Sequence, residues 1–396
     1  MLITFISFLL ILGSESYTID QQTQLHKDVL NGYDRRIRPG IDRSKPLQIE
    51  ASFYLTTLNA FSESEGRIAI VGAFRLTWID QRLSWNPTSY GNDLDKTTLF
   101  VKDIWTPQLV NWNPYNSLNF IGLDELSCII NFSGQVYFLP PDLYQATCDA
   151  DVTNYPFDKQ ICSLKYYIPG YYINDINITA TSSEFNLDLY TEHGLWDLRE
   201  TFIQVETTSN NFQVLGLTLH LKRRTTYYIA GLLLPIVLMN FIQLLVFLLP
   251  VESGERLGYC ITVLLAVTVF LTIIQDKLPE ASEPNVSLLT YKLLVDMIIG
   301  CGMILAVVIG MRFYHKTDDR EIPGCLQGFA KCFYLCCTPN NSNKVVELRP
   351  EKEDVEPKAM TVTWYDVGKA FDRVCLTVFF LSLVLNNSIY FITILL

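Results

Sequence analysis

Four long apolar stretches constrain the fold of this chain more than any other feature of its sequence. They cover residues 227–249, 257–274, 288–311 and 374–396, and the first of them contains no charged side chain. A helix that crosses the hydrocarbon core of a bilayer needs about 20 mostly apolar residues. We therefore expect four transmembrane helices.

The segment before these stretches has the pattern of a β-sandwich. Between residues 47 and 222, short runs of alternating apolar and polar residues are separated by Asn, Gly, Pro and Asp; examples are 48–55, 68–78 and 135–139. Alternation with a period of two is typical of half-buried strands, and frequent turn residues favour antiparallel connections. The sequence thus predicts an extracellular antiparallel β-sandwich plus a four-helix transmembrane domain.

The amino-terminal residues indicate that this sandwich is secreted across the membrane. An apolar run reaches Leu12, and the small residues Ser14 and Ser16 follow, which is typical of a signal peptide cleaved near Tyr17. The run is shorter than a spanning helix needs. The expected organisation is a signal peptide at 1–16, an extracellular domain at 17–224, transmembrane helices at 225–314, a cytoplasmic linker at 315–366, and an amphipathic lead-in with the fourth helix at 367–396.

An extracellular location brings oxidising conditions and glycosylation. Cys148 and Cys162 can form a disulfide in that compartment. Glycosylation sequons begin at Asn131 and Asn177 within the expected sandwich. Further sequons begin at Asn285, Asn340 and Asn386, in segments that we place at or within the membrane or in the cytosol.

Charge and residue types argue against two classes of protein. The net charge is −11, which disfavours nucleic-acid binding and favours the attraction of cations. The four histidines are scattered, and no nucleophile, phosphate-binding loop or metal-ligand set is apparent. We therefore expect neither an enzyme nor a cofactor. A cysteine cluster at the expected inner side lacks His and zinc-site spacing, so palmitoylation or inert thiols are the alternatives; it comprises Cys325, Cys332, Cys336 and Cys337.

Three other residues have structural interpretations. Lys292 and Asp296 are four residues apart in the third apolar stretch, so they share a helix face. We interpret them as a neutralising pair rather than an ion site. Cys128 lacks an evident extracellular partner, and burial in a strand is its simplest explanation.

Several motifs occur together and in order. Residues 78–85 read WIDQRLSW, residues 104–107 read IWTP, residues 134–141 read GQVYFLPP, and residues 148–162 read CDADVTNYPFDKQIC. This combination resembles the Cys-loop (pentameric ligand-gated) ion channel family, in particular an orphan subunit of invertebrate type in its nicotinic acetylcholine receptor-like branch. The resemblance implies a pentameric channel in the plasma membrane, multi-pass, with an extracellular amino terminus.

By this resemblance, the disulfide-closed loop lies at the base of the sandwich and transmits motion to the membrane domain. Phe157 would supply packing at its tip, and Asp158 would pair with Arg223, which precedes the first span. A solvated surface pair worth about 0–1 kcal/mol is the alternative. Pro279, in the linker 276–283 between spans two and three, would receive the motion.

The second span resembles the pore-lining helix of the family. Positions at alternating intervals of three and four fall on one helix face: Glu255, Gly258, Thr262, Leu265, Val269, Thr272 and Asp276. The face is polar at both ends and apolar in the middle, which indicates water rather than lipid beside it. Five copies would form two carboxylate rings that admit monovalent cations, with Glu255 as the selectivity determinant and Leu265 as the gate. A helix packed in a protein core is the alternative.

The resemblance also places an agonist site between neighbouring sandwiches, where an aromatic box holds a ligand. The implied residues are Trp112, Tyr171 and Phe212 on one face and Ala73, Arg75, Ile129, Tyr137 and Leu139 on the other. Pro169 and Ala73 stand where this branch has tryptophans, and the hairpin at 206–211 lacks the adjacent cysteines.

These departures favour a small-molecule agonist that is larger, more apolar or more anionic than acetylcholine. A homopentamer in contact with membrane lipid is expected, with a heteropentamer as the alternative. Two further alternatives are a structural subunit that needs a partner to complete its site, and a non-conducting binding receptor anchored by the same fold.

Overall fold

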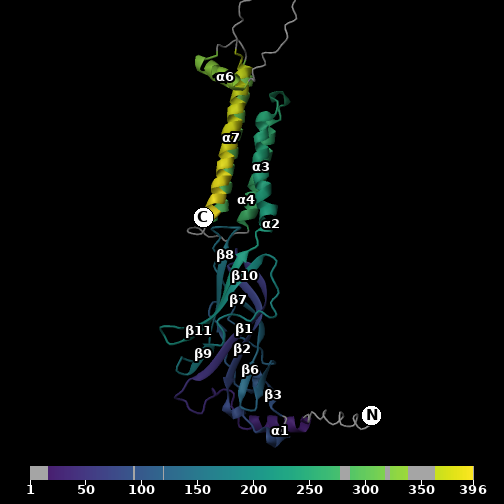
Figure 1. The fold of residues 1–396 in the computed structure, drawn as a ribbon, viewed down its shortest axis with the longest axis vertical. Coiled ribbons are helices and arrows are strands. Elements are labelled where there is room, and N and C mark those ends of the chain that lie inside the picture. The colour runs from purple at the N-terminus through teal and green to yellow at the C-terminus, as the bar shows by residue number, and fades with distance from the viewer. Residues whose placement is uncertain are drawn as a thin grey trace, which may run out of the picture. The chain divides into compact units, whose positions relative to one another are not determined.

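The computed structural model describes residues 17–91, 94–118, 120–276, 286–316, 322–337 and 362–395, and it divides into two compact units. The first unit contains the chain up to Asp151 together with Asp158–Arg224. The second contains Val152–Phe157 and the chain from Thr225 onward. Strands make up most of the first unit, and helices make up the second (Figure 1).

Two sheets form the first unit. The larger has the strand order β3-β5-β6-β2-β1-β9, with β7 also paired to β2, and the smaller has the order β10-β11-β8-β4. The strands are β1 (Leu47–Ser62), β2 (Arg67–Ile79), β3 (Lys96–Phe100), β4 (Val110–Asn111), β5 (Ser127–Asn131), β6 (Gln135–Phe138), β7 (Pro141–Thr147), β8 (Lys159–Tyr167), β9 (Ile176–Ala180), β10 (Trp196–Thr207) and β11 (Gln213–Arg223).

The predicted sandwich is confirmed, with one difference in strand direction. Most pairs are antiparallel, but β1 and β9 are parallel, with Leu47 opposite Ile176. A parallel pair cannot be joined by a tight hairpin, because the chain must cross over between the two strands. The long segment between β1 and β9 contains the seven strands β2 to β8 and makes this crossover.

Alternating burial along the strands builds the core between the sheets. Phe53 in β1 is paired with Phe74 in β2, and both side chains are fully buried. The Phe53 ring meets the rings of Phe74, Tyr144 and Phe185 edge to face, at centroid distances of 5.1, 5.4 and 5.2 Å. Cys128 is buried in β5 as expected, and burial raises the pKa of its thiol to about 12.

A helix that the sequence reading did not anticipate precedes the sandwich. Helix α1 (Ile19–Leu30) begins with a capping box, in which the Thr18 hydroxyl accepts from the Gln21 backbone and the Gln21 side chain accepts from the Thr18 backbone. It buries only Leu25 and Val29, so its apolar stripe is narrow. Short 3-10 turns occur at Gln81–Leu83, Pro87–Tyr90 and Val101–Asp103.

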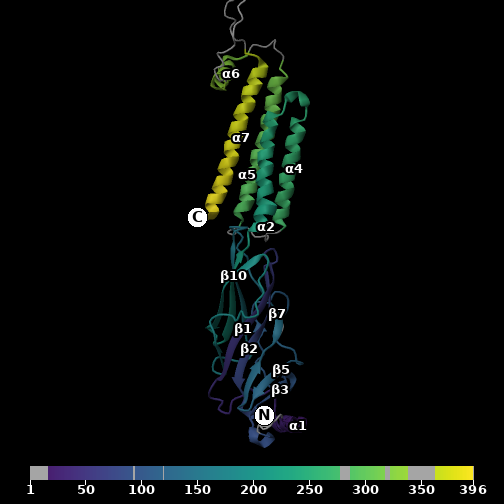
Figure 2. The ribbon, with the colours of Figure 1, turned by 45° about the vertical axis from the view of Figure 1, so that its right-hand side comes forward.

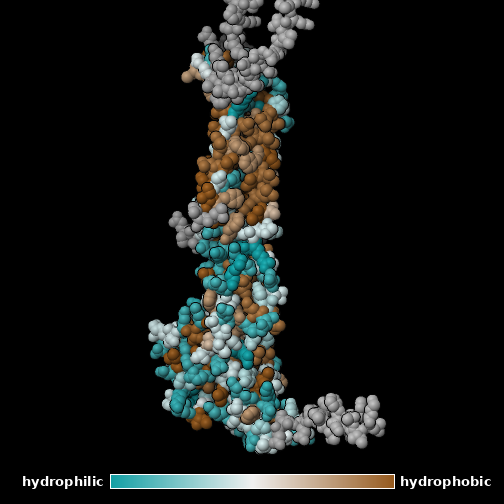
Figure 3. All heavy atoms as spheres, in the orientation of Figure 1, coloured by the Kyte–Doolittle hydropathy of each residue, from teal (hydrophilic) through white to brown (hydrophobic). Residues whose placement is uncertain are grey.

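Within the described residues, four helical segments of the second unit are long and apolar enough to cross a membrane: Thr226–Leu248, Arg256–Gln275, Leu288–Tyr314 and Trp364–Ile394. They contain α2 (Thr226–Tyr228), α3 (Leu234–Leu244), α4 (Arg256–Gln275), α5 (Leu288–Tyr314) and α7 (Trp364–Leu395), together with a π turn at Ile229–Leu233 and a 3-10 turn at Leu245–Leu248. The long helices lie side by side (Figure 2) and present a broad hydrophobic surface (Figure 3).

Outside these spans, the second unit has a 3-10 turn at Val251–Ser253 and helix α6 (Gly324–Cys337). Cys325 is exposed, whereas the side chains of Cys332, Cys336 and Cys337 lie outside the described residues. So do residues 1–16, where the signal peptide is predicted, and Pro279.

Two buried ion pairs hold charged residues inside the helical unit. The Lys292 ammonium lies 2.5 Å from the Asp296 carboxylate, and the Asn386 amide donates to the same carboxylate at 2.8 Å. The predicted structural pair is therefore confirmed. The Arg256 guanidinium forms the second pair with Asp372 at 2.9 Å.

Candidate functional site

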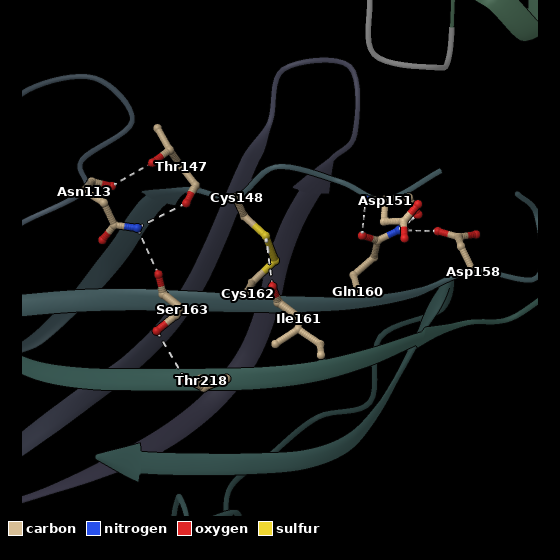
Figure 4. The surroundings of a disulfide bond; sticks show 10 residues. All are labelled: Asn113, Thr147, Cys148, Asp151, Asp158, Gln160, Ile161, Cys162, Ser163 and Thr218. Atoms are coloured by element: carbon tan, nitrogen blue, oxygen red, sulfur yellow. Dashed lines mark hydrogen bonds between the residues drawn. A yellow bond between two sulfur atoms is a disulfide. The ribbon is translucent and has the colours of Figure 1, made fainter. Parts of the chain in front are cut away.

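The disulfide-closed loop is the first candidate functional element. Cys148 follows β7 directly and Cys162 lies in β8, and the structure joins them by a disulfide (Figure 4). The Asn113 side chain donates to the carbonyl groups of Thr147 and Ser163 at 3.2 and 2.9 Å. Because these residues are neighbours of the two cysteines, Asn113 holds both ends of the loop together.

A buried ionic cluster lies where the loop returns to the first unit. The Arg223 guanidinium donates to the two Asp158 carboxylate oxygens at 2.7 and 3.0 Å and also pairs with Glu63. The Asp158 and Arg223 side chains are each 1% exposed, so the predicted pair forms and is not a solvated surface pair. The Gln160 amide donates to Asp158 at 2.6 Å, and the Trp196 ring lies 4.3 Å from the Arg223 guanidinium carbon. Arginine suits such a site because its fork binds a carboxylate with two parallel hydrogen bonds.

The tip of the loop, Val152–Phe157, belongs to the helical unit. The Thr153 carbonyl accepts from the backbone N–H of Leu288, at the start of α5, at 2.9 Å. Tyr155 is buried and its ring meets the ring of Tyr228 edge to face at 5.5 Å. Phe157, which the sequence reading expected to supply the packing, is only half buried. Tyr155 therefore supplies the main aromatic contact of the tip.

Helix α4 carries the second candidate element. The seven positions predicted to line a pore are all exposed in the structure: Glu255, Gly258, Thr262, Leu265, Val269, Thr272 and Asp276. They lie within an arc of about 100° when each residue is turned by 100° from the last. Leu265 is 63% exposed and Val269 is 51% exposed, whereas a helix packed in the core of this unit would bury both.

The threonines on this face satisfy their hydroxyl groups locally. The Thr262 hydroxyl donates to the Gly258 carbonyl and the Thr272 hydroxyl donates to the Val269 carbonyl, each at 2.8 Å. Such bonds to the preceding turn occur in apolar surroundings as well as in water. The threonines therefore do not distinguish water from apolar surroundings on this face. The carboxylates of Glu255 and Asp276 at its two ends are the more informative residues.

Two aromatic pairs contain residues predicted for one half of the agonist site. Trp112 is 52% exposed, and its ring meets the ring of Tyr167 edge to face at 5.0 Å. The rings of Phe212 and Tyr172 are tilted by 33° relative to each other, with their centroids 4.7 Å apart. Tyr171, which was expected here, packs instead against the sandwich core and lines a separate cavity. In the structure, Tyr167 and Tyr172 rather than Tyr171 form the aromatic pairs with Trp112 and Phe212.

The other predicted half lies on the outer face of the larger sheet. Arg75 is exposed on β2, and its guanidinium lies 5.7 Å from the centre of the Tyr137 ring. Ile129 is opposite Tyr137 in the register of β5 and β6. Ala73 is two residues before Arg75 on the same strand, and Leu139 is two residues after Tyr137. These five residues therefore form one continuous surface.

The two predicted glycosylation sites lie in the first unit. The Asn131 side-chain oxygen accepts from the backbone N–H groups of Ser133 and Gln135 at 3.1 and 3.0 Å. The Asn177 amide donates to Gln48 at 2.7 Å. Both sites remain predictions.

Two sequence families match the two units. Residues 22–225 match the family described as the neurotransmitter-gated ion-channel ligand binding domain, and residues 232–324 match the neurotransmitter-gated ion-channel transmembrane region. The first match alone spans more than half of the chain. This chain belongs to the neurotransmitter-gated ion-channel family. It is therefore a multi-pass protein of the plasma membrane with an extracellular amino-terminal domain, and its family is one of channels rather than enzymes.

Known members of this family illustrate the similarity. The neuronal acetylcholine receptor subunit beta-2 of Carassius auratus is 29% identical over 320 residues, which cover 78% of this chain and 68% of the relative. The acetylcholine receptor subunit delta of Rattus norvegicus is 29% identical over 371 residues, 89% of this chain and 70% of the relative. The neuronal acetylcholine receptor subunit beta-4 of Gallus gallus is 30% identical over 293 residues, 73% of this chain and 61% of the relative. The nicotinic-like resemblance inferred from the motifs is confirmed.

This neurotransmitter-gated channel subunit contains two residues, Tyr167 and Glu63, that the sequence analysis did not identify. The alternating pattern of the strand could have identified Tyr167. Cys162, Leu164 and Tyr166 are buried along β8, so strand alternation places Tyr167 on the outer side. Glu63, the second partner of Arg223, lies just beyond the end of β1, and no local pattern marked it.

Proposed function

We propose that this chain is a subunit of a cation-selective, ligand-gated pentameric channel with a divergent agonist site. The observation that carries the proposal is the exposed face of α4, which ends in the carboxylates of Glu255 and Asp276. The two residues are 276 − 255 = 21 positions apart, or about 30 Å along a helix. That distance matches the thickness of the hydrocarbon core.

Glu255 and Asp276 differ from the buried charged residues of the spans in having no ion-pair partner among the described residues, and this difference supports water on their face of α4. Lys292 and Arg256 are buried against carboxylate partners, whereas Glu255 and Asp276 form no ion pair with any described residue. An unpaired carboxylate facing lipid would be strongly unfavourable. A central water-filled pore, formed when five copies place this face inward, removes that cost and creates two rings that attract cations.

The middle of the same face supports the assignment of a gate. Leu265 and Val269 are the most exposed apolar residues at the predicted pore positions between the polar ends, so five copies would form two adjacent apolar rings. A narrow apolar ring excludes water and therefore blocks ions without a mechanical plug. Leu265 is the proposed gate and Glu255 the proposed selectivity determinant.

Expression of the chain alone with Leu265→Thr tests the channel proposal without an agonist. A hydroxyl at the constriction is expected to let water in, so the variant should carry current that the parent chain does not. Diluting external sodium chloride should move the reversal potential with the sodium gradient. Glu255→Ala should reduce this cation preference, and Glu255→Asp, which keeps the charge, is the matched control. Reversal potentials that follow chloride would contradict the proposal.

The agonist site supports a ligand different from that of the relatives. One half offers the aromatic pairs of Trp112 with Tyr167 and of Tyr172 with Phe212, and the other half offers the Arg75 guanidinium. A guanidinium repels an ammonium ligand, while Pro169 and Ala73 leave space that indole rings would fill. We therefore propose a larger, more apolar or anionic agonist instead of acetylcholine.

Currents from the Leu265→Thr channel give an assay for this proposal. Aromatic carboxylates are expected to change the current more than acetylcholine does, and Arg75→Gln should weaken that response. Trp112→Ala should weaken it as well, because the aromatic half would lose a ring. A saturable response to acetylcholine that Arg75→Gln leaves unchanged would contradict the proposed ligand class.

We propose a homopentamer, since one chain supplies both halves of the site. Pro169, in the position of a tryptophan of this branch, favours the alternative that a second subunit supplies the aromatic half. The mass of the complex purified after expression of this chain alone distinguishes the two. A pentamer supports the homomeric assembly, and a monomer supports a partner-dependent subunit.

A further inference from the structure

A cavity of about 400 Å³ lies in the first unit, between the segment that leads into β1 and the ends of β2 and β6. None of the residues assigned above to the agonist site, the ionic cluster or the pore lines it. Its volume is in the range of small-molecule pockets, which are commonly 300–1,000 Å³. The cavity is therefore large enough for an organic ligand.

A buried cation lines this cavity without a carboxylate partner. Arg38 is only 6% exposed, and its guanidinium makes one hydrogen bond to the described residues, a long one of 3.4 Å to the Pro39 carbonyl. It forms no ion pair within the described part of the chain. A guanidinium has five N–H donors, and buried charges are normally paired and hydrogen-bonded. Arg38 thus has most of its donors available to a ligand.

A second buried donor lines the same cavity. Trp78 is 1% exposed, and its indole N–H has no hydrogen-bond acceptor among the described residues. Buried indole N–H groups usually find an acceptor, and an exception calls for one that is absent from the chain itself. The cavity lining therefore includes two buried residues, Arg38 and Trp78, with hydrogen-bond donors that the described residues leave unused, which suits an acceptor-rich ligand.

The charges and apolar groups at the rim limit the ligand further. Lys45 adds one positive charge, while Asp42 and Glu50 add two negative charges, so with Arg38 the lining is neutral overall. A dianion would be repelled by the two rim carboxylates more than a monoanion would. Ile41 lines the cavity although it is 84% exposed, and it offers an apolar contact to the body of a ligand.

We propose that this cavity binds a small monocarboxylate with an apolar body, whose carboxylate is held by the Arg38 guanidinium. Two parallel N–H···O bonds from the arginine fork recognise the planar carboxylate. The apolar body lies toward Ile41 and Ile79, which is also exposed at the rim. The site lies within one subunit and is separate from the proposed agonist interface.

Benzoate is a suitable probe, and benzamide is its matched neutral analogue. Binding to the purified full-length chain in lipid nanodiscs can be measured by saturation-transfer NMR, with every variant carrying Arg75→Gln so that the proposed agonist site, which is also expected to take aromatic carboxylates, is weakened throughout. Benzoate should bind saturably and roughly tenfold or more tightly than benzamide, because hydrogen bonds to a charged group contribute more than neutral ones. Succinate, a dianion, should compete poorly.

Variants assign the binding to the cavity. Arg38→Lys keeps the charge but loses the fork, so benzoate affinity should fall about tenfold. Arg43→Gln changes an arginine of the same segment that does not line the cavity, and it should leave binding unchanged. Ile41→Asp adds a negative charge at an exposed position and should weaken benzoate binding roughly fivefold relative to Ile41→Asn. The comparison of Ile41→Asp with Ile41→Asn tests whether benzoate binds in the cavity even if Arg38→Lys does not fold.

Four results would overturn the proposal. The first is equal binding of benzoate and benzamide. The second is benzoate binding that Ile41→Asp leaves unchanged. The third is loss of binding in Trp112→Ala, which would place benzoate at the agonist interface. A change of oligomer size in Arg38→Lys without any benzoate binding would show that a neighbouring subunit supplies the carboxylate, and it too would overturn the proposal.

Discussion

Replacing Asp158 by asparagine removes one carboxylate from the buried cluster but leaves Arg223 with Glu63 as a partner. Removing one member of a buried ion pair generally costs about 3–5 kcal/mol, because the remaining charge stays buried without compensation. Glu63 is 15% exposed and still pairs with Arg223, and the asparagine oxygen still accepts one hydrogen bond. We therefore expect Asp158→Asn to cost about 3 kcal/mol, at the lower end of that range.

The expected change in melting temperature follows from the size of the extracellular domain. For domains of 150–250 residues, 1 kcal/mol shifts Tm by about 2–4 °C, so Asp158→Asn should lower it by about 6–12 °C. Thermal melting of the full chain in nanodiscs, followed by tryptophan fluorescence, measures this shift. The double variant with Glu63→Gln should melt at a lower temperature still, because Arg223 would then have lost its ion pairs with both Asp158 and Glu63.

An exposed ion pair provides the matched control for this prediction. Asp197 pairs with Arg199 at 2.7 Å, with side chains 35% and 57% exposed. Exposed pairs contribute about 0–1 kcal/mol, so Asp197→Asn should hardly change Tm. Equal melting temperatures for Asp158→Asn and Asp197→Asn would refute the reasoning that burial makes the Asp158 pair strong. Asp158→Asn should also reduce the current of channels opened by Leu265→Thr if the cluster couples the loop to the gate.

Three further outcomes are expected. Cys162→Ser opens a loop whose ends are 14 positions apart, which should cost about 3 kcal/mol by loss of chain constraint and lower Tm in non-reducing buffer. Burial lowers the pKa of His193 below its usual value of 6.5, and the Arg224 guanidinium lowers it further. Near and below pH 6.5 the unfolded chain therefore binds more protons than the folded domain, so the domain should lose stability as the pH falls from about 7.5 to 5.5. His193→Gln should reduce that loss. Asp296→Asn leaves the buried ammonium of Lys292 unpaired and should reduce pentamer yield more than Lys292→Met combined with Asp296→Leu.

The membrane spans and the strands β1, β2 and β6 were predictable because their signals are local. A span needs only continuous hydropathy, and a half-buried strand needs only alternation, so each can be read without knowing its neighbours. The parallel pairing of β1 with β9 depends on segments more than a hundred residues apart, and nothing in either strand encodes its partner. Helix α1 escaped notice because only Leu25 and Val29 are buried, too few to produce a clear 3.6-residue pattern.

The aromatic pairs show which features of the candidate agonist site could not be predicted from the sequence. Tyr171 and Tyr172 are adjacent and chemically identical, so sequence alone cannot say which one faces outward. The structure decides through a turn, in which the Tyr172 carbonyl accepts from the Asp175 N–H at 2.8 Å and the Asp175 carboxylate accepts from the Tyr172 N–H at 3.2 Å. This turn fixes Tyr172 beside Phe212. Site residues on regular strands, such as Tyr167, follow from strand alternation, whereas those on turns depend on local hydrogen bonds that a one-dimensional pattern does not contain.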